Sequence, residues 1–128
     1  MQDKQKTLKV FCDTNVLLNP KFNFQDYQKV YISIVSIEEL DKLKRDERIS
    51  YQVRQTIKNI KYDSNVEIVM NCANISKFMF LEHGNDNVIL NMAYQVYTDD
   101  NEVLFLSDDY NLIIKAQALG LPFKMFVL

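Results

Sequence analysis

The chain has 128 residues, which corresponds to one domain, expected to span residues 1–128. With 48% hydrophobic and 25% charged residues, the composition excludes a disordered chain, and no apolar run reaches 18 residues, which excludes a membrane-spanning helix. The net charge of −2 excludes a simple basic nucleic-acid binder. The polar start, Met1–Lys6, lacks the apolar stretch of a secretory signal, so we expect a cytoplasmic protein.

Strand-like and helix-like patterns alternate along the chain. Short runs rich in β-branched and aromatic residues predict strands at 8–13, 29–35, 66–70, 103–107 and 122–128. Apolar residues at spacings of three and four predict helices that start near residues 36, 49, 86 and 108, with a short additional helix around 74–81. This alternation predicts an α/β domain with a mostly parallel sheet.

Helix boundaries are indicated by local signals. Ser36 followed by Glu39 reads as a capping box, which predicts a helix beginning at Ser36 with Leu40 and Leu43 on its buried face. Gly120 predicts the end of the last helix.

Four carboxylates follow strands or open helices. Asp13 ends the first strand, Glu39 lies in the first turn of the next helix, Asp86 opens a helix, and Asp109 follows the fourth strand. Ligands of parallel sheets bind at the carboxyl ends of the strands, so these side chains are expected to converge. Two of them in contact would repel by about 4 kcal/mol at an effective dielectric near 20, which a divalent cation would offset. Oxygen ligands favour Mg²⁺ or Mn²⁺.

Each carboxylate also has a purely structural interpretation. Glu39 can complete a capping box, and Asp86 and Asp109 can be helix caps or first-turn acids favoured by the helix dipole. Asp13 is harder to explain in this way, because it ends an apolar strand. The four positions together, in this topology, favour a shared metal site.

Other chemistries have little support. The sequence has no glycine-rich phosphate loop, and its single histidine, His83, lies in a polar stretch without a nucleophile elbow. Cys12 and Cys72 lie in apolar runs and are expected to be core residues rather than a disulfide or zinc ligands.

Basic residues are concentrated in one segment. Residues 41–61 contain seven basic and three acidic side chains, a net charge of +4, so the rest of the chain carries −6. This uneven distribution suits a protein that gathers carboxylates around a metal and offers cations to a phosphate backbone, although a solvated helix face is the simpler interpretation. Tyr31, Tyr51 and Tyr110 could stack an unpaired base, with packing as the simpler role.

Several motifs together resemble those of a known family. The sequences VFCDTNVLL (10–18), VSIEELDKLK (35–44), NDNVIL (85–90) and FLSDDYNLIIKA (105–116) resemble a PIN domain, with the PIN domain of PhoH-like proteins as the closest likeness. The resemblance covers almost the whole chain in the right order. It implies a three-layer α/β/α sandwich with a parallel sheet of about five strands in the order 3-2-1-4-5.

The resemblance also implies an activity. Many PIN domains are metal-dependent ribonucleases, and by position the acidic cluster is Asp13, Glu39, Asp86 and Asp109, which would bind Mg²⁺ or Mn²⁺. Asn15 and Ser107 match polar residues that support the site, whereas Asp108 is expected to face solvent. The cations expected to bind the backbone of single-stranded RNA are Lys42, Lys44, Arg45 and Arg48.

Alternatives remain open at this point. A non-catalytic PIN-like binding or assembly module would use the same acids as caps, and a toxin of a toxin–antitoxin pair would be the same enzyme in another role. Flap-type DNA nucleases share the chemistry but are longer. A homodimer and an inhibitory or assembly protein are further partners that the resemblance allows.

Overall fold

Five parallel strands form one central sheet in the computed structural model, which describes residues 7–70 and 84–126. The order is β3-β2-β1-β4-β5, which confirms the expected strand order, and β1 is therefore the central strand. The strands are β1 (Lys9–Cys12), β2 (Lys29–Ser33), β3 (Val66–Val69), β4 (Val103–Ser107) and β5 (Phe123–Met125). The described residues do not include Cys72, His83 or the segment 74–81 in which a short helix is expected.

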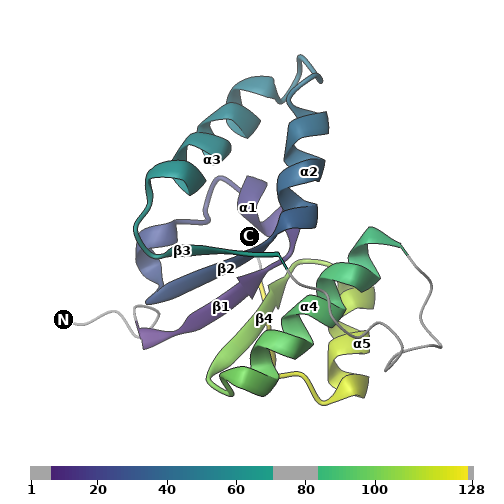
Figure 1. Cartoon of the computed structure of the whole chain (residues 1–128). Helices are drawn as coiled ribbons and strands as arrows, with labels where there is room; N and C mark the ends of the chain where they lie inside the picture. Colours follow the sequence, from purple (N-terminus) through teal and green to yellow (C-terminus); the bar gives the residue numbers. More distant parts are fainter. Residues whose placement is uncertain (1–6, 71–83, 127–128) are drawn as a thin grey trace.

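Helices cover both faces of the sheet, so the expected three-layer sandwich is confirmed. Figure 1 shows α1, α2 and α3 on one side of the strands and α4 and α5 on the other. The helices are α1 (Thr14–Leu18), α2 (Ile34–Leu43), α3 (Ser50–Tyr62), α4 (Asn85–Asp99) and α5 (Tyr110–Leu119), with a 3-10 turn η2 (Phe24–Asp26). No helix in these described ranges is long and apolar enough to cross a membrane.

Side-chain alternation along the strands produces two cores. Phe11 and Phe105 pack with α4 and α5, whereas Val10 and Ile32 pack with α1, α2 and α3. All four side chains are fully buried. Because successive residues of a strand face opposite sides, a strand covered on both faces is apolar at nearly every position, as β1 and β4 are. Cys12 is buried in the core that contains Val10 and Ile32, as expected.

The start of α2 differs from the sequence prediction. The helix begins at Ile34, and the Oγ of Ser33, not of Ser36, accepts the capping hydrogen bond from the Val35 amide at 2.9 Å. Ser36 is buried inside the helix, so the predicted capping box is wrong. Ile34 and Val35 have high strand propensity, but they pack against the core of α4 and α5, and this tertiary contact outweighs the propensity.

The end of α5 provides a test of the fold. Gly120 has φ of 76°, the left-handed conformation that ends many helices, and its amide donates to the carbonyls of Ala116 and Gln117. We expect Gly120→Ala to destabilise the protein by about 1 kcal/mol in urea denaturation, because a Cβ disfavours this conformation. Gly120→Asn should lose less, since asparagine tolerates positive φ; equal losses would show that φ is not the cause.

Candidate active site

Asp13 occupies the carboxyl end of the central strand. It follows β1 directly and is the N-cap of α1, and only 4% of its surface is exposed. Its Oδ1 accepts a hydrogen bond from the Thr14 amide at 2.8 Å, and its Oδ2 accepts one from the Ser107 hydroxyl at 3.0 Å. Ser107 ends the neighbouring strand β4, so this predicted supporting residue directly contacts the acid.

Burial changes the protonation of Asp13. Loss of hydration is the main cause that raises the pKa of this carboxyl to about 6, from an ordinary value of 3.8. The hydrogen bonds from Ser107 and Thr14 act in the opposite direction, and the negative charges of Asp86 and Asp108 raise the pKa further. The ionised form of the Asp13 carboxyl is therefore destabilised, and a bound cation would stabilise it.

Thr14 connects Asp13 to the second acid. While its amide binds Asp13, its hydroxyl donates to Oε1 of Glu39 at 2.7 Å and lies 2.7 Å from Oγ of Ser36. A hydroxyl has one hydrogen, and an ionised carboxylate only accepts, so Ser36 must be the donor to Thr14. The result is a chain of hydrogen bonds from buried Ser36 through Thr14 to Glu39 that fixes the glutamate relative to Asp13.

Three of the four predicted acids line one hollow. Its volume is about 340 Å³, and it lies where α1, α2 and the start of α4 meet, at the carboxyl end of the sheet. The residues lining it are Asp13, Thr14, Asn15, Glu39, Lys42, Leu43, Asn85 and Asp86. The predicted supporting residue Asn15 and the predicted RNA-binding residue Lys42 thus lie beside these acids.

Asp109 has a different position from the other three. It is the N-cap of α5, where its Oδ1 accepts from the Asn111 amide at 2.8 Å and from the Leu112 amide at 3.4 Å. Its own amide donates to Ser107 Oγ at 3.0 Å, but its side chain is not among those lining the hollow. Asp108 is exposed to solvent, as expected, yet its charge reaches Asp13.

The donor set around the hollow matches a hard divalent cation in chemistry. Three carboxylates and two side-chain amides, without a sulfur or imidazole donor among the lining residues, are the ligand types of Mg²⁺ and Mn²⁺. Within residues 7–70 and 84–126, however, no three acidic, histidine or cysteine side chains are close enough to hold one ion. The Glu39 carboxylate is held instead by the hydrogen bond from the Thr14 hydroxyl.

The predicted RNA-binding cations differ in their surroundings. Lys44 pairs with Asp41 at 2.6 Å, and the Arg48 guanidinium pairs with Asp46 at 2.9 Å. Lys42 and Arg45 are exposed. Lys44 and Arg48 therefore have acidic partners already, which reduces the charge they offer to a phosphate.

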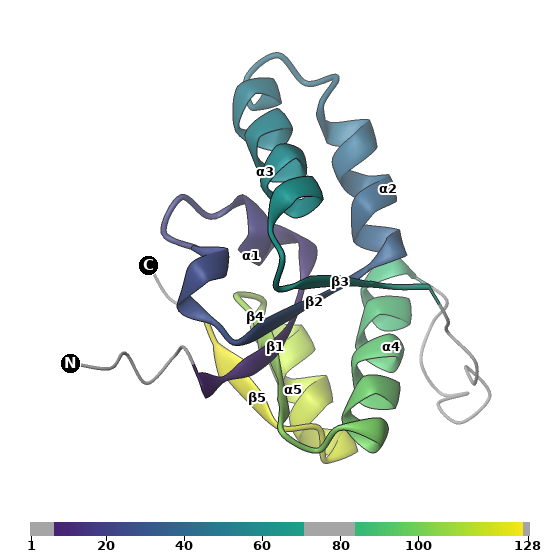
Figure 2. The same cartoon turned by 60° about the vertical axis from the view of Figure 1, so that its left-hand side comes forward.

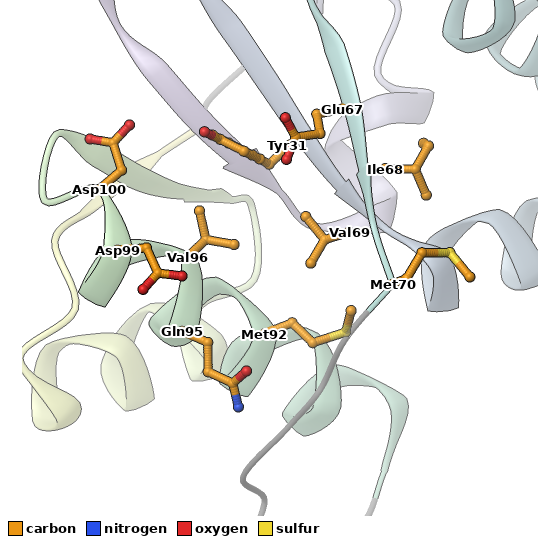
Figure 3. A pocket seen from close by; sticks show the side chains of 10 residues that line it. All are labelled: Tyr31, Glu67, Ile68, Val69, Met70, Met92, Gln95, Val96, Asp99 and Asp100. Atoms are coloured by element: carbon orange, nitrogen blue, oxygen red, sulfur yellow. The ribbon is translucent and has the colours of Figure 1, made fainter.

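A second hollow, of about 390 Å³, lies between β3 and α4 (Figure 3). Its acids are Glu67 on β3 and Asp99 and Asp100 at the end of α4, which is the opposite end of that helix from Asp86. Asp100 binds Lys9 at 2.8 Å, and Glu67 binds Lys29 at 2.7 Å. Two of these three acids are thus neutralised within the protein, unlike those of the first hollow.

Comparison with known sequences identifies the family. The sequence matches the PIN domain family over residues 10–126. The chain belongs to the PIN domain family. Members of this family are generally nucleases, and the sandwich described above is the nuclease-type PIN fold. No curated protein matches the sequence of this PIN domain.

Two solved structures share the fold of this PIN domain at low sequence identity. A domain of a functionally unknown protein from Methanocaldococcus jannaschii superimposes with a TM-score of 0.66 at 16% identity, over 95% of this chain and 93% of the other. VapBC2 from Rickettsia felis, bound to a DNA fragment from its promoter, superimposes with a TM-score of 0.60 at 13% identity, over 94% and 100%. At these identities the likeness concerns the fold.

Sequence reasoning missed the roles of Thr14 and Ser36 in this PIN domain. In the sequence, Thr14 stands out only as part of the motif at 10–18, and Ser36 only as a predicted helix cap. A signal existed in the spacing: Ser36 precedes Glu39 by three residues, so in a helix that already includes Ser36 the two side chains share a face.

The raised pKa of Asp13 predicts a pH dependence of stability. The folded state binds a proton more tightly than the unfolded state, so without metal the free energy of unfolding should fall by about 2 kcal/mol as pH rises from about 4 to 6. Urea denaturation across this range tests the prediction. Asp13→Asn should remove this decrease in stability with pH. Glu38→Gln, which changes an exposed glutamate next to Glu39 in the sequence, should keep it. Equal pH profiles for wild type and Asp13→Asn would contradict it.

The Thr14 hydroxyl predicts a second stability effect. Thr14→Val keeps the shape but removes the hydroxyl that binds Ser36 and Glu39, so we expect a loss of about 1–3 kcal/mol, and Thr14→Ser should retain most of the stability. A double-mutant cycle with Ser36→Ala measures the coupling. Additive losses would contradict the hydrogen-bond chain.

Proposed function

We propose that this PIN domain is a metal-dependent endoribonuclease that hydrolyses phosphodiester bonds of single-stranded RNA. The main support is that Asp13, Glu39 and Asp86, from three separate elements, line one hollow at the carboxyl end of the sheet. Membership of a family that generally consists of nucleases adds to this support. The raised pKa of Asp13 indicates a carboxylate placed at a cost in stability, as is common at functional sites.

In this proposal Asp13, Glu39 and Asp86 would hold Mg²⁺ or Mn²⁺. Asp109, the fourth predicted acid, caps α5 outside the hollow and is not one of the proposed ligands. A bound divalent cation polarises a phosphodiester and lowers the pKa of a bound water. Ser107 and Thr14 hold the Asp13 carboxylate in one orientation through their two hydrogen bonds. The Thr14 hydroxyl, itself held by Ser36, donates to Glu39, whose carboxylate would orient the attacking water.

The remaining polar residues of the hollow have roles in substrate binding. Lys42 brings a positive charge to the edge of an otherwise acidic site, where it would bind a phosphate next to the cleaved bond. Asn15 is exposed at the same edge and has an amide that can both donate and accept. Cleavage would leave 5′-phosphate and 3′-hydroxyl ends.

A protein partner is a second part of the proposal. The Rickettsia felis structure with the same fold is a VapBC2 assembly on promoter DNA. A toxin role, with an inhibitory partner that covers the hollow, would keep the same chemistry. Inhibition of cleavage by a protein encoded beside this one would support it.

Cleavage of a 5′-labelled single-stranded RNA tests the enzyme directly. We expect cleavage with Mn²⁺ or Mg²⁺ but not with EDTA, and a loss of about 100-fold or more in Asp13→Asn, because the charge stabilisation lost is several kcal/mol. Glu38→Gln, one residue from Glu39 but exposed, is the matched control and should cleave normally.

Two outcomes would contradict this. Cleavage that persists in EDTA or in Asp13→Asn would show that the acidic cluster is not the active site. RNA that binds without being cleaved in any metal would favour the non-catalytic binding module.

A further inference from the structure

The exposed face of α3 combines aromatic and basic side chains. Tyr51 and Tyr62 have exposed fractions of 77% and 76%, among the highest of the large hydrophobic side chains in the described ranges. At 100° per residue, Tyr51, Lys58 and Tyr62 fall within about 40° of one another around the helix axis. Arg54 and Lys61 border the same stripe, and we call these five residues the α3 face.

The α3 face is positively charged and unpartnered. The helix contains three basic residues and no acidic one. Among the ion pairs of the described residues, none includes Arg54, Lys58 or Lys61. This contrasts with Lys44 and Arg48, which are held by aspartates. The strongest unneutralised charge of the basic segment 41–61 is therefore on α3.

The other side of α3 is fully used in packing. Val53 and Thr56 are buried, and Thr56 donates a hydrogen bond to the Leu17 carbonyl of α1. Figures 1 and 2 show α3 alongside α2, and all five residues of the α3 face are exposed. The core therefore does not account for two tyrosines on the outer side.

We propose that the α3 face is a docking surface for single-stranded RNA, a proposal that rests on the proposed nuclease function. Arg54, Lys58 and Lys61 would contact phosphates, while Tyr51 and Tyr62, about 16 Å apart along the axis, would each stack on an unpaired base. Two aromatic rings with cations between them fit a single strand, whose bases are free to stack. A duplex or a phosphate-bearing membrane has no such free bases.

The position of α3 agrees with a substrate that continues from the hollow. The helix packs against α1, whose N-cap is Asp13, and against α2, which contains Glu39 and Lys42. The three elements thus form one side of the sandwich (Figure 2). Of the other tyrosines considered for stacking, Tyr31 is buried, with 8% exposed, and contributes to the core.

The test uses tryptophan fluorescence, since the chain has no tryptophan of its own. In the Asp13→Asn background, which prevents cleavage, Tyr51→Trp and Tyr62→Trp each introduce a single reporter. We expect oligouridine to quench both emissions, because stacking places a base on the indole ring. Phe123→Trp, on β5 at the far edge of the sheet, is the matched reporter and should not respond.

Charge substitutions test the same surface independently. Arg54→Gln/Lys58→Gln should reduce the slope of log affinity against log salt by about 1.4, because each phosphate contact on a single strand contributes about 0.7. Lys44→Gln/Arg48→Gln makes the same charge change nearby and should alter the slope less. An equal or larger effect of that pair would overturn the α3 face as the docking surface.

The outcomes separate this proposal from the proposed function. RNA that is cleaved by the wild type and bound by Asp13→Asn, without a response from either α3 tryptophan, overturns the docking surface alone. RNA that is neither cleaved nor bound overturns both. A response equal to that of Phe123→Trp shows general quenching and also overturns the docking surface.

Discussion

A carboxylate buried at the end of the central strand is the constraint on which the rest of the site depends. Asp13 has little contact with water, so it relies on the hydrogen bonds from Ser107 and Thr14. Ser107 also accepts from the Asp109 amide, and Thr14 also binds Glu39. Two hydroxyl groups around one acid thus join β1, β4, α1, α2 and the start of α5.

The same constraint leaves an excess of negative charge. Asp86 and Asp108 add to the field at Asp13, and Lys42 is the one cationic side chain among the described residues lining the hollow. Elsewhere in the described chain, carboxylates such as Asp100 and Asp46 have a bound lysine or arginine, which holds the pKa of each below its ordinary value. The acids of the hollow therefore differ from these paired carboxylates, as expected if an external cation completes the site.

Much of this arrangement followed from the sequence, because it depends on periodicity and strand order. Apolar runs located all five strands, and the family resemblance supplied their order, which together bring Asp13, Glu39 and Asp86 to one edge. Details that depend on tertiary contacts did not follow. Local propensity could not show that α2 begins two residues before Ser36. It also could not show that Lys44 forms an ion pair with Asp41 whereas Lys58 forms none with the described residues.

A crystal structure of the protein soaked with Mn²⁺ tests the central claim most directly, since the anomalous signal of Mn²⁺ identifies its position. We expect a peak in the hollow, with carboxylate oxygens of Asp13 and Asp86 at about 2.0–2.6 Å or bridged by water. The peak should be absent in Asp13→Asn crystals treated in the same way. A protein that binds Mn²⁺ only between β3 and α4, near Asp99, or that leaves the hollow without metal at saturating Mn²⁺, would contradict the account.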